Sequence, residues 1–206
     1  MYRILTTFII LLGATVTSFA QDNELHLIHS DEYIQKEKNL EKKPLVKVQD
    51  RFFGMKLGKK YSYQWIKSAL EPRCTFVQET IRKQIAEATD VQFGGHNWDV
   101  CSIHITDKGF FNRIAFTESF VEDHVEQGVN SFCTVLEELG TKYDLTVESL
   151  EEGGERAQYL GKNFVMVILQ LKTGVARNGT VKLFLTLTYI DGVTTLKKKI
   201  GGINEL

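Results

Sequence analysis

The sequence predicts an α+β protein in which an antiparallel β-sheet of hairpins is covered by two helices. Residues 101–105 alternate apolar and polar side chains before a turn at 107–109, the pattern of a half-buried strand that enters a hairpin. Residues 165–189 hold two further alternating segments around a loop with glycine and asparagine. Residues 121–139 repeat apolar side chains every three or four positions, which is typical of an amphipathic helix.

The composition indicates one globular domain, or one domain with a tail. The chain has 206 residues, of which 43% are hydrophobic, so it buries enough apolar surface to offset chain entropy, and disorder throughout is excluded. Its 25 Lys and Arg residues face 26 Asp and Glu residues. Because no excess of positive charge attracts phosphates, a general nucleic-acid-binding role is excluded as well.

Residues 1–20 predict a secretory signal peptide. A basic residue precedes an apolar stretch over 4–13, and the small residues Ser18 and Ala20 occupy the positions that a signal peptidase reads before Gln21. We expect cleavage after Ala20 and a periplasmic or secreted product, with an uncleaved membrane anchor as the alternative. No later segment reaches membrane-spanning length, so no membrane span is expected after cleavage.

Residues 21–50 predict a charged, exposed arm, because they are rich in charged residues and lack the periodicity of a core element. A solvated helix over 30–42, capped by Ser30, fits within it. Such an arm is either a spacer or a segment that docks on a partner. His26 and His29 offer a weak hint of metal binding.

The globular domain is expected over 51–191, followed by a C-terminal tail over 192–206. A short strand broken by Gly54 and closed by Gly58 opens it. Ser62 is a plausible N-cap for the first helix, which Pro72 ends. The apolar residues that fall at helical spacing are Trp65, Ile66, Ala69 and Leu70.

Residues 74–93 fit both a helix and strands, because their apolar positions match either period. The strand over 101–105 is expected to return after its turn as a partner strand over 110–117.

The second helix is expected to begin at a capping box formed by Ser119 and Glu122 and to end at Gly140. Cys133 lies beside its apolar stripe. The stripe consists of Val121, Val125, Val129, Phe132, Leu136 and Leu139. In the loop of the last hairpin, residues 178–180 also match the glycosylation acceptor pattern, which we interpret as coincidence.

The three cysteines allow at most one internal disulfide. Cys101 on a strand and Cys133 on a covering helix lie in different layers, whose separation exceeds the usual reach of a disulfide, so both are predicted to be buried thiols. Nothing near them or near Cys74 indicates a nucleophile.

Three short patterns resemble those of small exported bacterial proteins, many of them from Bacteroides-like bacteria and mostly uncharacterised. The patterns are a Phe-Gly strand with a second glycine, a Phe-x-Gly-x-x-Trp element and a helix that ends in Leu-x-x-Lys-Tyr. They are carried by Phe53, Gly54 and Gly58, by Phe93, Gly95, Trp98 and Asp99, and by Leu139, Lys142 and Tyr143.

The resemblance spans roughly residues 51–191 and extends more distantly to modules like the β-lactamase-inhibitor protein and the outer-membrane-assembly lipoproteins. It implies a binding domain without catalysis, and strands rather than a helix over 74–93.

The search for chemistry returns one cluster, His96, Asp99 and His104, with zinc-ligand residue types. An extended strand would hold the two histidines roughly 26 Å apart, so they share a metal only if Gly94 and Gly95 begin a sharp bend. The alternative is that the glycines form a bulge or turn, with His104 on the exposed face.

No catalytic, cofactor-binding or metal-binding residue is therefore assigned, and no cofactor is expected. The favoured function is an exported binding or interaction module, whose partner stays open, a protein being the first candidate. The alternative is a periplasmic enzyme whose site is assembled from scattered residues. A deep pocket with convergent polar groups would favour the enzyme, and a flat sheet face with exposed aromatic side chains would favour binding.

Overall fold

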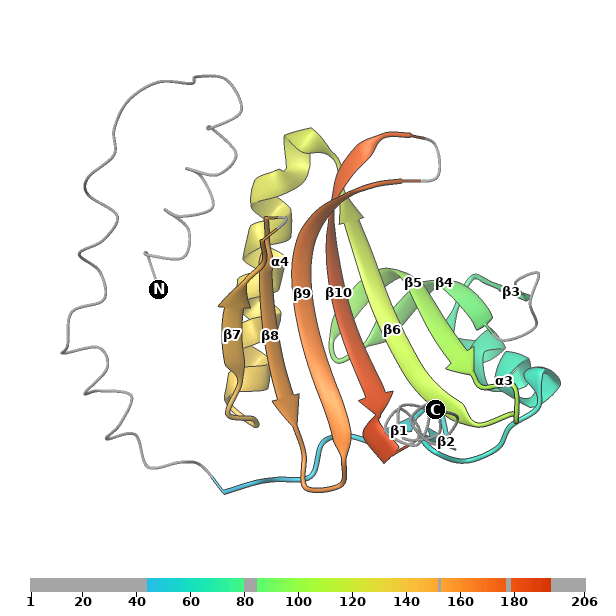
Figure 1. Ribbon diagram of the computed structural model, residues 1–206. Helices are drawn as coiled ribbons and strands as arrows, with labels where there is room; N and C mark the ends of the chain where they lie inside the picture. The colour runs from blue at the N-terminus through green and yellow to red at the C-terminus, as the bar shows by residue number, and fades with distance from the viewer. Residues whose placement is uncertain (1–43, 80–84, 152, 177–178, 194–206) are drawn as a thin grey trace, which may run out of the picture. The chain divides into compact units, whose positions relative to one another are not determined.

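Figure 1 presents a computed structural model, which describes residues 44–79, 85–151, 153–176 and 179–193. Every element described below lies in the unit that begins at Leu45. The predicted signal peptide, the helix over 30–42, Asn178 and most of the C-terminal tail lie outside the described residues.

An eight-stranded sheet forms the body of this unit, with strand order β3-β4-β5-β6-β10-β9-β8-β7 and antiparallel pairing throughout. The α+β class and the antiparallel sheet are thus confirmed. The strands are β3 (Phe76–Glu79), β4 (Ile85–Phe93), β5 (His96–Ile105), β6 (Phe111–Phe120), β7 (Thr146–Ser149), β8 (Glu155–Leu160), β9 (Val165–Val175) and β10 (Val181–Asp191).

The sheet consists of two halves with the same order of elements. Helix α3 (Tyr63–Leu70) precedes β3 to β6, and helix α4 (Val125–Gly140) precedes β7 to β10. Strands β7, β8 and β10 each begin 70 positions after β3, β4 and β6 respectively. Pairing between β6 and β10, from Phe120 opposite Leu183 to Arg113 opposite Ile190, joins the halves into one sheet. Both helices lie behind the sheet in Figure 1.

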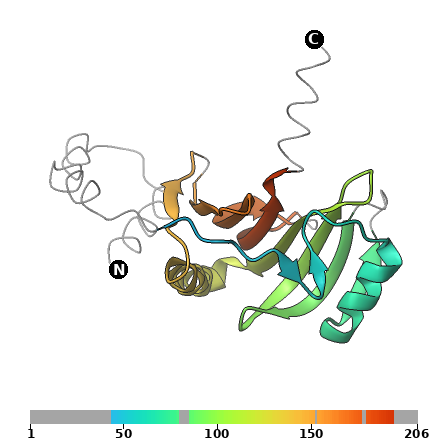
Figure 2. The same cartoon turned by 90° about the horizontal axis from the view of Figure 1, so that it is seen from below.

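Helix α4 packs closely on the sheet, as the view from below in Figure 2 also shows. A Cβ atom added at Gly128 would lie 2.8 Å from side-chain atoms of both Leu183 and Phe120, so only glycine allows this approach. The face that it buries differs from the predicted stripe. The buried residues are Gly128, Val129, Phe132, Val135 and Leu139, whereas Val125 and Leu136 are half-buried and Val121 is exposed.

The predicted capping box at the start of this helix is wrong. Ser119 belongs to β6, where its backbone N–H and its hydroxyl donate to the Asp99 carboxylate at 2.8 and 2.9 Å. A 3-10 turn over Glu122–His124 follows, and α4 begins at Val125 without a side-chain cap. Strand pairing with β10 therefore overrides the local capping signal.

The first residues of the domain differ from the single strand that the sequence predicted. Instead of one strand, β1 (Arg51–Phe52) and β2 (Met55–Lys56) form a hairpin. The Ser62 cap of α3 is confirmed, since its hydroxyl accepts from the Trp65 N–H, and a 3-10 turn over Glu71–Arg73 extends the helix past Pro72.

The sequence left the secondary structure of residues 74–93 open and did not predict strands β7 and β8. Residues 74–93 contain β3 and β4, so the alternative of strands holds there. Strands β7 and β8 were not predicted, because β7 is exposed along its whole length and β8 buries only Ala157 and Tyr159.

The folded unit begins before Arg51. Val48 is fully buried, its N–H donates to the Asn163 side-chain oxygen at 3.0 Å, and its carbonyl accepts from the Asn163 amide at 2.9 Å. Residues 45–50 are therefore part of the globular unit rather than of an exposed arm.

The three cysteines are free thiols. Cys101 is buried as predicted, and burial raises its pKa, with a smaller contribution from Cys74. Cys133 is only half-buried, which corrects the prediction. Burial, followed by the charge of Glu137, raises the pKa of Cys133 too, so neither thiol is activated.

Replacing Phe132 by alanine is expected to destabilise the protein by about 3–5 kcal/mol, because the ring is 1% exposed and its loss leaves a cavity between α4 and the sheet. Asn130→Ala on the exposed side of the same helix should change the free energy of unfolding by less than about 0.5 kcal/mol. Urea unfolding measures both. Equal, small effects would show that this face of α4 does not pack on a core.

Candidate functional site

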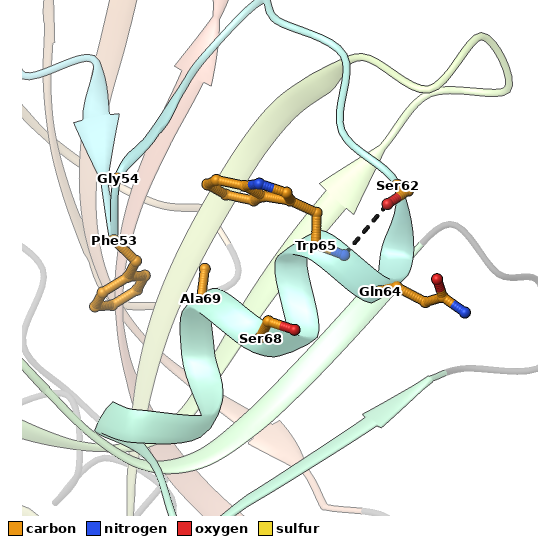
Figure 3. Close-up of a pocket in the computed structure, with 7 residues that line it drawn as sticks. All are labelled: Phe53, Gly54, Ser62, Gln64, Trp65, Ser68 and Ala69. Carbon is orange, nitrogen blue, oxygen red and sulfur yellow. Dashed lines mark hydrogen bonds between the residues drawn. The ribbon is translucent and has the colours of Figure 1, made fainter.

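A pocket of about 580 Å³ lies between helix α3 and the β1–β2 hairpin. Its lining residues come from only these two elements and the helix cap. They are Phe53, Gly54, Ser62, Gln64, Trp65, Ser68 and Ala69. Figure 3 shows Trp65 lying across one side of the pocket, Phe53 on the other and Ala69 pointing between them, while the Gln64 side chain points away.

The hairpin wall is built on a strained turn. Phe53 and Gly54, the two loop residues, have φ values of 50° and 81°, as in the turns that match the twist of paired strands. Such a position normally takes Asn, Asp or Gly, and a bulky residue there costs about 1–3 kcal/mol. The Phe53 ring offsets part of this cost by packing against Phe93 and Phe116, with centroids 6.3 and 6.2 Å away.

Phe52 anchors this hairpin in the core. Its ring is 2% exposed and lies 4.8 Å from Tyr189 on β10, 5.7 Å from Phe93 on β4 and 6.4 Å from Phe116 on β6. Because this aromatic cluster includes strands from both halves of the sheet, the position of the Phe53–Gly54 turn is fixed by the core.

The helix wall presents a tryptophan to solvent. Ile66 and Leu70 bury one face of α3, which leaves Trp65 45% exposed on another face. Tyr61 lies against the Trp65 indole with ring centroids 4.8 Å apart, so the indole is held in place although it is exposed. Although Trp65 falls at helical spacing with Ile66 and Leu70 in the sequence, it is not among the buried residues of α3.

The lining of the pocket holds no side chain suited to acid–base chemistry. None of its seven lining residues has an ionisable side chain. The Ser62 hydroxyl is occupied as the helix cap, and Ser68 has no base among these residues to activate it. The remaining surface is mostly aromatic and apolar, with Gly54 leaving the edge of the indole open.

The sheet face opposite the helices is a weaker candidate. Its central positions mix half-buried polar residues such as Thr117, Thr186 and Gln170 with half-buried apolar residues such as Ile168 and Phe184. Among the described aromatic residues, only Trp65 and Phe164 are exposed, and neither belongs to the centre of that face. Phe164 lies in the tight turn between β8 and β9 and lines no pocket described here.

The residues of the predicted metal cluster make separate contacts. His96 Nε2 lies 3.1 Å from the Glu138 carboxylate on α4, Asp99 accepts hydrogen bonds from Ser119, and His104 lies opposite Arg113. Gly94 and Gly95 form the turn between β4 and β5. Across the described ranges, no group of three His, Cys, Asp or Glu side chains is placed to hold a metal ion; His26 and His29 lie outside them.

His104 is half-buried on β5 rather than exposed. Burial lowers the pKa of its imidazole, the neighbouring Arg113 guanidinium lowers it further, and the Glu87 carboxylate acts in the opposite direction. The folded protein therefore favours neutral His104.

Comparisons with protein families, with curated proteins and with solved structures gave no match. Within the described residues, none of the helices combines the length and the apolar character needed to cross a membrane.

Replacing His104 by glutamine should flatten the pH dependence of stability on the acidic side. The unfolded chain takes up a proton near pH 6.5, above the lowered pKa of the folded state, so the wild type loses stability as the pH falls through that window. His104→Gln should lose less between pH 7.5 and pH 5, measured by urea midpoints. Burial raises the pKa of Glu118 and Glu155 in both proteins and cancels in the comparison. Parallel pH curves would refute the assignment.

Proposed function

We propose that the protein is an exported binding module that holds a partner in the pocket beside Trp65. The observation that carries this proposal is an indole that is 45% exposed and yet fixed against Tyr61. A large apolar side chain kept in water on a rigid element gains free energy when a partner covers it, and little conformational freedom is lost on binding.

The free energy gained by covering one tryptophan is large enough for Trp65 to be the main contact of a binding site. Truncation of a tryptophan at the centre of an interface commonly costs about 2 kcal/mol or more, which corresponds to more than a tenfold change in affinity. The absence of ionisable groups among the seven lining residues supports recognition over catalysis at this pocket.

The scaffold proposed for this role is the antiparallel sheet of hairpins covered by two helices, released to the periplasm or outside the cell after cleavage of residues 1–20. The resemblance to exported bacterial proteins and, more distantly, to inhibitor-protein modules supports the same role, because such modules bind without catalysis. The Phe53–Gly54 landmark of that resemblance forms one wall of the pocket.

A photo-crosslinking amino acid tests the proposal in the native host when it is placed at Gln64, a lining residue whose exposed side chain points away from the pocket and so leaves the space between Trp65 and Phe53 free for the partner. The variant is expected to form a discrete adduct with one partner on illumination, and the adduct should disappear when Trp65→Ala is added. Trp65→Ala is expected to fold, because the side chain lies outside the buried face of α3.

The matched control carries the same crosslinker at Asn130, an exposed position on α4. Identical adduct patterns at positions 64 and 130, or an adduct at 64 that persists without the indole, would contradict a specific site at this pocket.

A further inference from the structure

We propose that the partner is an acidic segment of another protein that inserts an apolar or aromatic side chain between Trp65 and Phe53. This inference rests on the proposed function and adds the chemistry of the ligand. It follows from the positive charge of the segments around the pocket, whose own lining residues are uncharged.

Positive charge is concentrated in the part of the chain that builds the pocket. Residues 51–73 form both walls and contain six lysine or arginine residues but one acidic residue, Glu71. The whole chain, by contrast, has a formal net charge of −1, so the rest of the protein is acidic. The six basic residues are Arg51, Lys56, Lys59, Lys60, Lys67 and Arg73.

On the hairpin side, two of these cations flank the turn. Arg51 and Lys56 are cross-strand partners one residue pair away from the Phe53–Gly54 loop, so their side chains share one face of the hairpin. Arg51 is exposed, and Lys56 lies 3.6 Å from the Asp50 carboxylate.

On the helix side, Lys59 and Lys60 precede Ser62, the cap that lines the pocket. Both are exposed, and Lys60 Nζ lies 5.0 Å from the centre of the Phe110 ring. Within the described part of the chain, neither lysine belongs to an ion pair with a carboxylate. Their charge is therefore available to a partner within a Debye length of about 10 Å.

An uncharged interior with a cationic rim selects a ligand with two parts. The slot between the two rings accepts an apolar or aromatic side chain, because burying a charge there would leave it unpaired. The rim attracts carboxylates that stay partly in water, which adds association rate and specificity. A peptide such as Asp-Glu-Asp-Phe-Asp-Glu-Asp supplies both parts in one segment.

Fluorescence anisotropy with this peptide, labelled with fluorescein, tests the proposal on the full mature chain. Binding should weaken by about tenfold or more when the peptide Phe is replaced by Ala, and similarly when its acids are replaced by Asn and Gln. Trp65→Ala should abolish binding of the parent peptide.

The charge-reversed double variant Lys59→Glu/Lys60→Glu should weaken binding by about tenfold and reduce its dependence on salt between 25 and 150 mM. The matched control, Lys142→Glu/Lys172→Glu, makes the same change of net charge at exposed positions away from α3 and should bind like the wild type. Equal losses of peptide affinity in the two double variants would refute a role for Lys59 and Lys60 in binding.

Two further results would refute an acidic protein segment as the ligand. Phosphatidylglycerol vesicles that bind the protein independently of Trp65, while the peptides do not bind, would indicate a membrane surface. An adduct at position 64 in the native host without any peptide binding would leave the pocket as the site and refute an acidic segment as its partner. Failure of both experiments would refute the proposed function itself.

Discussion

The pairing of β6 with β10 is the constraint on which the rest of the structure depends. These strands are far apart in sequence, and their register from Phe120 and Leu183 to Arg113 and Ile190 turns two four-stranded meanders into one sheet. The aromatic cluster forms only across this seam, since Phe93 stacks on Phe116 at 4.1 Å from one half and Tyr189 is contributed by the other. Burial, followed by the charge of Tyr143, raises the pKa of Tyr189 and keeps its phenol neutral in this core.

The pocket is a consequence of that seam. Phe52 inserts between the aromatic rings of both halves, and the next two residues must then turn back over α3 with positive φ angles. The strain at Phe53 is maintained because its ring still reaches Phe93 and Phe116. The buried aromatic side chains thus hold one wall of the pocket, and Trp65 stays exposed on the other wall.

The elements that sequence reasoning predicted are those with strong local periodicity. The strand containing Cys101, the pair of strands around residue 175 and the Ser62 cap all carry their own signal. The helix start failed at Ser119 because a capping box is a local pattern, whereas the Asp99 carboxylate and the β10 pairing are non-local.

The candidate site was not predictable for a related reason. Trp65 falls at helical spacing with Ile66 and Leu70, and only the tertiary structure shows that it stays 45% exposed beside the β1–β2 turn. An unusual residue at a hairpin turn, Phe before Gly where Asn is common, was the one available signal in the sequence. The exposed strand β7 carried no such signal in the sequence, since its side chains face no core.

The central claim is that a partner covers Trp65, and the two indole N–H resonances of the chain test it most directly. Titration of ¹⁵N-labelled protein with the acidic Phe peptide should shift the Trp65 resonance. The Trp98 resonance should stay in place, because that indole is 2% exposed and its N–H donates to the Phe93 carbonyl at 3.1 Å. A static Trp65 resonance, with shifts confined to sheet residues such as Thr186 and Gln170, would contradict the account and place the partner on the open face of the sheet.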